Sequence, residues 1–162
     1  MKAKHILIAL FLGAVLQATP AMAQLSAPGA PKPPVGVPAD AKLFNGKWYK
    51  VIFEKTSWTG ARDKCRTLGG QLAIIPDEVT WVYVKGLTPA NVWLGGTDEK
   101  IEGVWVWVDG TPVTFTAWGH NQPDNQGGDA PENYITADRG QWNDTVKNNP
   151  YNTGFICEWK DK

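Results

Sequence analysis

The sequence predicts an α+β domain, with its helices early in the chain and short antiparallel strands later. Ala61, Cys65 and Leu68 are spaced four and three residues apart, which is the spacing of a buried helix face. Valine and tryptophan alternate strictly from Val104 to Val108, which is typical of a half-buried strand. The chain has 162 residues, enough for one domain with a single core.

Two helices are expected. A capping residue, Thr56 or Ser57, begins the first, and a Gly-Gly pair after Leu68 ends it. The second is opened by residues 76–78, whose acids suit the first turn of a helix, and ends near residues 85–86. Strands are expected at residues 46–53, 72–75, 92–96, 103–108, 134–137, 141–142 and 155–159. The long irregular loop before residue 134 is of a kind that is usually functional.

The first 23 residues are predicted to be a secretory signal peptide. Lys2 and Lys4 precede an apolar run from Ile6 to Leu16, and residues 21–23 form a small-residue cleavage site. The apolar run has 11 residues, whereas a bilayer span needs about 20. We therefore expect a secreted or periplasmic protein with no membrane span after cleavage; an uncleaved anchor is the alternative.

Residues 24–42 are predicted to be a Pro-rich linker. Five prolines are separated by glycine, alanine and serine without apolar periodicity, which indicates an extended spacer rather than a folded part. The folded domain is therefore expected to occupy residues 43–162.

Charge and reactive side chains exclude several functions. The chain has 16 basic and 16 acidic residues, and two of the basic ones lie in the leader, so nothing in its charge favours nucleic acid as a partner. An enzyme is not expected, because His120 is the one histidine after the leader and no hydrolase or zinc motif is present. Cys65 and Cys157 are expected to form a disulfide in an oxidising compartment, with two free thiols as the alternative.

The segment from residue 122 to residue 144 combines oxygen-bearing side chains with turn residues. Its motifs bring together three carboxylates and three carboxamides: Asp124, Glu132, Asp144, Gln122, Asn133 and Asn143. No cluster of cysteine or histidine lies nearby, so the pattern favours a hard cation such as Ca²⁺, which takes roughly 6–8 oxygen ligands. Taken alone, such loops are more often solvated turns.

Four short motifs follow one another along the chain: Trp93-Leu94-Gly95-Gly96, Gln122-Pro123-Asp124, Trp142-Asn143-Asp144 and residues 155–158. In this order they resemble the C-type lectin-like domain, here in a secreted, bacterial-type form. The first is similar to the "WIGL" core strand of that family, the second matches its galactose-type "QPD" motif, and the third matches its "WND" motif. Residues 155–158 match its closing strand, and the resemblance covers residues 44–159.

The resemblance implies a fold with two helices, two antiparallel sheets and a long calcium-binding loop. It also implies a disulfide between Cys65 and Cys157 and a cis peptide bond before Pro123. The second disulfide of the family would need cysteines near Tyr134 and Lys147, which are absent. The loop is therefore expected to depend more strongly on the ion for its order.

The resemblance further implies a principal Ca²⁺ held by Gln122, Asp124, Glu132, Asn143 and Asp144. Two vicinal sugar hydroxyls would complete the shell and contact Gln122, Asp124, Glu132 and Asn143. The order of amide and acid in the QPD motif implies glycans ending in galactose or N-acetylgalactosamine as partners. Asp129 competes with Glu132 for the ligand role, and Glu132 is favoured because it aligns with the following strand.

A second calcium ion would be held by the side chains of Asp98, Glu102, Asn125, Glu132 and Asn133. Two of these are amides where the family has acids, so the site departs from the usual pattern.

One family feature is missing, because no aromatic residue follows Asp124 to stack on a sugar. Trp118, His120 and Tyr151 are the candidates to replace it. The absence keeps an alternative function open: a protein- or surface-binding adhesion module in which calcium only orders the loop.

Overall fold

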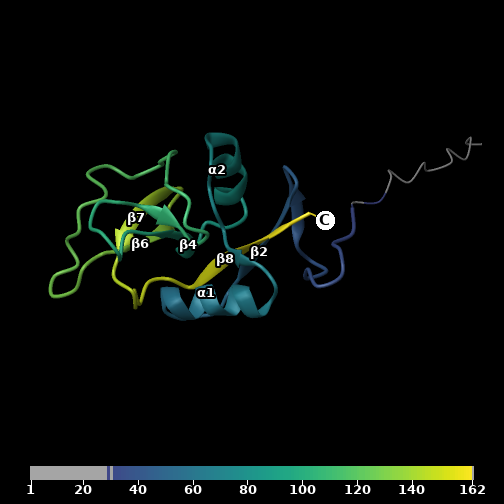
Figure 1. The fold of residues 1–162 in the computed structure, drawn as a ribbon, viewed down its shortest axis with the longest axis horizontal. Coiled ribbons are helices and arrows are strands. Elements are labelled where there is room, and N and C mark those ends of the chain that lie inside the picture. Colours follow the sequence, from purple (N-terminus) through teal and green to yellow (C-terminus); the bar gives the residue numbers. More distant parts are fainter. Residues whose placement is uncertain (1–28, 30, 162) are drawn as a thin grey trace, which may run out of the picture. The chain divides into compact units, whose positions relative to one another are not determined.

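A computed structural model describes residue 29 and residues 31–161. The predicted signal peptide and the first residues of the linker lie outside the described residues. The chain divides into two units, and the second, residues 31–162, holds all the helices and strands described below (Figure 1). No helix within the described ranges is both long and apolar enough to cross a membrane.

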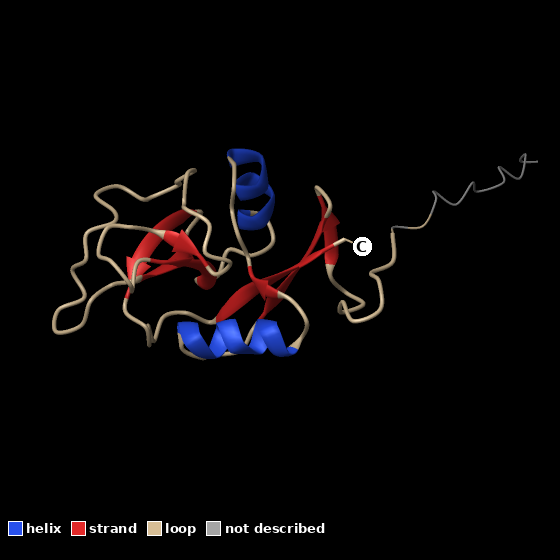
Figure 2. Ribbon diagram, viewed as in Figure 1, coloured by secondary structure: helices blue, strands red, loops and turns tan. Residues whose placement is uncertain are grey.

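Both predicted helices are confirmed, and Ser57, one of the two capping candidates, caps the first. Helix α1 spans Trp58–Thr67, and the Ser57 hydroxyl accepts a hydrogen bond from the backbone amide of Gly60 at 3.1 Å. Helix α2 spans Glu78–Lys85, and the Asp77 carboxylate caps it. The two helices lie on opposite sides of the strands (Figure 2).

Eight strands form one hydrogen-bonded sheet. They are β1 (Lys42–Phe44), β2 (Lys47–Ile52), β3 (Gln71–Leu72), β4 (Val92–Thr97), β5 (Val106–Trp107), β6 (Tyr134–Asp138), β7 (Gln141–Thr145) and β8 (Gly154–Lys160). The order along the main path is β1-β2-β8-β4-β6-β7, with β3 on β8 and β5 on β4.

The α+β class is confirmed, but the two expected antiparallel sheets are joined. Strands β4 and β8 pair in parallel, with Val92 facing Gly154 and Trp93 facing Phe155. The other strand pairs are antiparallel, and β2 lies against β8 near the two ends of the domain. This parallel pairing therefore joins the group of strands β1, β2, β3 and β8 to the group β4, β5, β6 and β7.

Three strand predictions were wrong in extent, and strand β1 was not predicted. Of the predicted residues 72–75 only Leu72 lies in a strand, because β3 spans Gln71–Leu72. Within residues 103–108 only Val106–Trp107 form a strand. The alternation there has another cause: Trp105 and Trp107 both pack against aromatic rings, at 4.9 Å from Trp118 and 5.6 Å from Trp142 between ring centroids. Strand β7 is longer than expected, so Asn143 and Asp144 lie within a strand rather than after one.

The second half of the predicted linker is folded. Two turns shape it, because the backbone amide of Val37 donates to the Pro34 carbonyl and that of Ala41 to the Pro38 carbonyl, each at 3.0 Å. Ala41 is buried and belongs to the same apolar cluster as Trp48. Apolar contacts therefore hold this segment on the domain, although its composition predicted an extended spacer.

The interior consists of two apolar clusters. The first packs α2 against the sheet around Trp81 and Trp142. The second packs α1 against β8 and contains the disulfide between Cys65 and Cys157, which confirms that predicted pairing. Both clusters support the strands that carry the candidate site.

Candidate metal centre

Two residues of the candidate site, Asn143 and Asp144, lie in strand β7. Ile135 on β6 faces Asp144, and Thr136 faces Asn143. Trp142 is fully buried, as expected for a core residue beneath the site. The long loop that ends at β6 brings Gln122, Asp124 and Glu132 to the same place.

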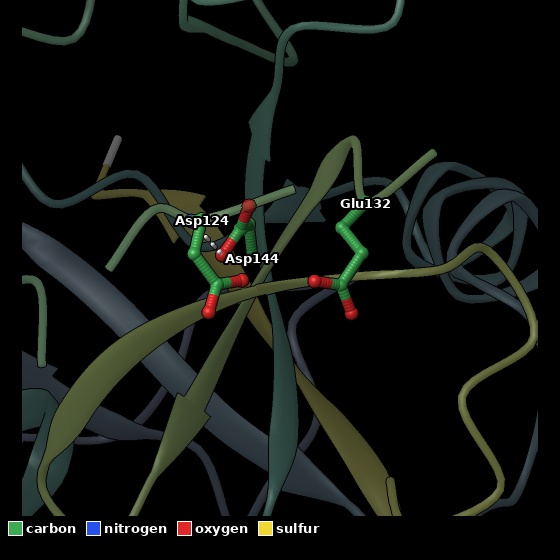
Figure 3. Close-up of side chains that lie close together, drawn as sticks. All are labelled: Asp124, Glu132 and Asp144. Atoms are coloured by element: carbon green, nitrogen blue, oxygen red, sulfur yellow. Dashed lines mark hydrogen bonds between the residues drawn. The ribbon is translucent and has the colours of Figure 1, made fainter. Parts of the chain in front are cut away.

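Three carboxylates meet where this loop crosses β7. One oxygen each from Asp124, Glu132 and Asp144 lie within 4.8 Å of one another. Asp144 is buried, and the other two are half-buried. Figure 3 shows Asp124 beside Asp144, with Glu132 extending toward them from the other side. The acid that joins the cluster is thus Glu132, whereas Asp129 is exposed.

Backbone amides hold these carboxylates. Asp144 accepts from the amides of Asp124 and Asn125, at 3.2 and 2.8 Å. The amide of Gln126 donates both to Glu132, at 3.0 Å, and to Asp124, at 3.2 Å. Three successive amides therefore face the cluster.

The site is electrostatically uncompensated. No lysine or arginine in the described part of the chain forms an ion pair with any of the three carboxylates. Burial, followed by the charges of Asp144 and Asp124, raises the pKa of Glu132 to about 7. A bound cation would relieve this repulsion.

The two predicted amide ligands differ in their surroundings. The Gln122 amide nitrogen donates to Asp124 at 3.2 Å, while its Oε1 is buried without a hydrogen-bond partner. The peptide bond between Gln122 and Pro123 is cis, as the resemblance predicted. The Asn143 amide donates instead to the Asp144 carbonyl. The structure therefore places the Gln122 amide against Asp124, and Asn143 precedes Asp144 on β7.

This donor set fits a hard divalent cation. Every candidate ligand atom is an oxygen, and three of the groups are carboxylates, which suits Ca²⁺. The unpartnered Oε1 of Gln122 is the independent indication, because buried polar atoms in native proteins nearly always have a partner.

The residues predicted for a second ion are only partly brought together. Asp98 is buried, and its backbone amide donates to the Asn133 carbonyl. Asp98 Oδ1 and Asn133 Oδ1 are both buried without a partner. Burial raises the pKa of Asp98, and the Asp144 charge adds to the rise. Glu102, in contrast, is exposed, and the Asn125 Oδ1 accepts from the Glu132 amide at 2.8 Å.

The three aromatic candidates for sugar stacking lie in different settings. Trp118 packs at 5.6 Å from Trp142 between ring centroids and so serves the core. His120 is exposed in the loop, and Tyr151 is 76% exposed in the connection between β7 and β8.

Sequence reasoning missed the backbone donors at residues 124–126 and the hydrogen bond from the Glu132 amide to the Asn125 side chain. Asn125 has a φ of 48°, in the left-handed region that asparagine tolerates. An asparagine just before Gly127 and Gly128 was the signal that could have indicated such a turn.

The family model of the C-type lectin domain matches residues 54–159, and the chain belongs to this family. C-type lectin domain family 4 member F of Mus musculus is 34% identical over 125 residues, covering 72% of this chain but 22% of that protein. A perlucin-like protein of Mytilus galloprovincialis is 33% identical over 141 residues, covering 82% of this chain and 89% of that protein. Both relatives are animal proteins, so they do not support the bacterial-type form.

Solved structures share the fold. The carbohydrate-recognition domain of the mouse scavenger receptor C-type lectin has a TM-score of 0.71 and 32% identity, over 78% of this chain and 100% of that one. A calcium-independent type II antifreeze protein has a TM-score of 0.68 and 26% identity, over 77% of this chain and 95% of that one. The fold thus occurs in lectins and in antifreeze proteins, and none of these four proteins is named as an enzyme.

Proposed function

We propose that this protein is a secreted, calcium-dependent lectin for sugars of the galactose type. The observation that carries the proposal is the meeting of Asp124, Glu132 and Asp144 within 4.8 Å without a cationic partner among the described side chains. The unpartnered oxygen of Gln122 supports it. The family membership adds that some relatives are lectins.

In this proposal, the ion is held by the residues predicted from the sequence: Gln122, Asp124, Glu132, Asn143 and Asp144. When bound, Ca²⁺ would supply coordination for two neighbouring sugar hydroxyls. The carboxylates of Asp124 and Glu132 would accept hydrogen bonds from these hydroxyls, and the amides of Gln122 and Asn143 would donate hydrogen bonds to the hydroxyl oxygens.

The preferred sugar follows from the order of amide and acid on the cis-Pro turn. With Gln122 before Asp124, the resemblance points to the 3-OH and 4-OH of a terminal galactose or N-acetylgalactosamine. The swapped order would instead favour mannose-type sugars.

A glycan array with and without EDTA tests the proposal. We expect hits that end in galactose or N-acetylgalactosamine, lost in EDTA and restored by added calcium. Asp124→Asn should abolish them, whereas Asp129→Asn should not, because Asp129 is an exposed acid outside the cluster. Hits that survive EDTA would refute the coordination mechanism.

The second candidate is an adhesion module in which calcium only orders the loop. The specific observation that favours it is the packing of Trp118 into the core, together with the lack of an aromatic at residues 125–128. If calcium stabilises the protein but the array shows no glycan, this second function replaces the first.

Export after cleavage of the signal peptide is part of the proposal. N-terminal sequencing of the exported protein should show Gln24 as its first residue.

A second bound calcium ion is also part of the proposal. The unpartnered oxygens of Asp98 and Asn133 support a second calcium ion, which a binding stoichiometry of two would establish.

A further inference from the structure

The loop between Asp124 and Glu132 is held by hydrogen bonds more than by packing. Residues 128–131 are exposed, and the loop contributes no side chain to the two apolar clusters. The backbone is closely packed at Gly127, where a Cβ would clash with the Ala130 carbonyl, with Cγ of Glu132 and with Cγ1 of Val146. The path of this loop therefore determines where the Glu132 carboxylate lies.

Three acids at short range repel one another, so donors have to keep them together. The amides of residues 124–126 do this, and they converge because the chain passes through the left-handed region at Asn125. Successive amides in such a turn form a concave site for negative charge.

Asn125 is the residue that links this turn to both other parts of the site. Its backbone amide donates to Asp144 Oδ2 at 2.8 Å, 19 positions along the chain. Its side-chain Oδ1 accepts from the backbone amide of Glu132 at 2.8 Å, seven positions along. Gln126, in contrast, contacts the cluster through its backbone amide, so its side-chain identity is not needed there.

We propose that Asn125 is a positioning residue of the calcium site: its side-chain carbonyl fastens Glu132 in place and thereby sets calcium affinity without binding the ion. The inference rests on the proposed function, since it presupposes that calcium binds here. It differs from the sequence-based role of Asn125 as a ligand of a second ion.

Calorimetric titration with calcium tests the proposal on wild type, Asn125→Gly, Asn125→Asp and Gln126→Ala. Glycine suits the positive φ and removes only the side chain. We expect Asn125→Gly to bind calcium about tenfold more weakly, the effect of losing one well-placed hydrogen bond. Asn125→Asp keeps the acceptor and should stay within about threefold of wild type or bind more tightly, and Gln126→Ala should match wild type.

Hydrogen exchange of the Glu132 amide in the calcium-free protein gives a readout independent of the ion. The Glu132 amide should be protected from exchange in wild type and in Asn125→Asp. In Asn125→Gly this amide should exchange at least about tenfold faster, because the side-chain oxygen that accepts its hydrogen bond is lost. An unprotected Glu132 amide in wild type would overturn the proposal without any variant.

The outcomes separate this inference from the proposed function. A wild-type protein that binds no calcium refutes the function itself. Wild-type affinity in Asn125→Gly refutes only the positioning role. If that variant loses one of two ions while the other binds unchanged, Asn125 is a ligand of the second ion and the positioning role is also overturned.

Discussion

Trp142 and Asp144 lie on the same face of β7, and both are buried, with exposed fractions of 0% and 1%. Residues two apart in a strand share a face, so the Asp144 carboxylate of the candidate site lies on the same side of β7 as the buried Trp142 ring. The Trp142 ring meets four others edge-on, at 5.6 to 5.9 Å between centroids. The part of the candidate site on β7 is therefore packed against the aromatic core.

Replacing Trp142 by alanine should destabilise the domain by ~3–5 kcal/mol, the usual cost of deleting a large buried aromatic. Urea denaturation measures this cost. Val79→Ala is the control, because Val79 is 64% exposed and its loss should change the free energy of unfolding by no more than about 0.5 kcal/mol. Equal effects of the two changes would contradict the packing described above.

Calcium should raise the melting temperature, and Asp144→Asn should remove that gain. At a calcium concentration about 100-fold above Kd, binding stabilises the folded state by ~2.7 kcal/mol, which amounts to several degrees for a domain of this size. Differential scanning calorimetry with calcium and with EDTA measures the gain. Asp129→Asn should retain it in full, and a gain that persists in Asp144→Asn would remove Asp144 from the ligand set.

Calcium affinity should increase as pH rises through about 7, because Glu132 must lose its proton to bind the ion. The calcium-free protein should show the opposite trend in stability. The folded pKa of Glu132, about 7, lies above its ordinary value of 4.5. Between these two values the folded state binds more protons than the unfolded state, so the free energy of unfolding falls as pH rises.

The variant Glu132→Gln tests whether Glu132, rather than another acid of the cluster, causes this pH dependence of stability. The variant carries no proton at this position to release, so the fall in calcium-free stability between pH 5 and pH 8 should flatten. Chemical denaturation in EDTA at several pH values gives the slope. An unchanged slope in Glu132→Gln would show that a different group titrates.

Removing the disulfide should destabilise the domain by roughly 4–5 kcal/mol, because the bond closes a loop of 92 positions between α1 and β8. Cys65→Ala with Cys157→Ala, compared with wild type in urea with and without reductant, measures the effect. Reductant should weaken wild type and leave the double variant unchanged. A wild type insensitive to reductant even when unfolded would contradict the bond.

Local features of the sequence were sufficient for the two helices, and the presence of only two cysteines was sufficient for the disulfide partners. Ser57, one of the two predicted capping residues, caps α1, and Asp77, predicted only among the residues that open the second helix, caps α2. Such caps are local, because a capping side chain bonds to an amide only three residues away. The motif resemblance identified Asp124, Glu132 and Asp144, whose carboxylates the structure then brings together.

The sequence by itself determined the class of fold, the helix boundaries and the residue types of an oxygen-rich site, since periodicity, capping and composition act over a few neighbouring residues. Only the tertiary structure decided that β4 and β8 join the strands into one sheet and that residues 34–41 fold onto the domain. It also decided that Asn125 bridges Glu132 and Asp144. These features depend on which distant segments meet, and a loop without a repeating pattern carries no periodic signal of its partners.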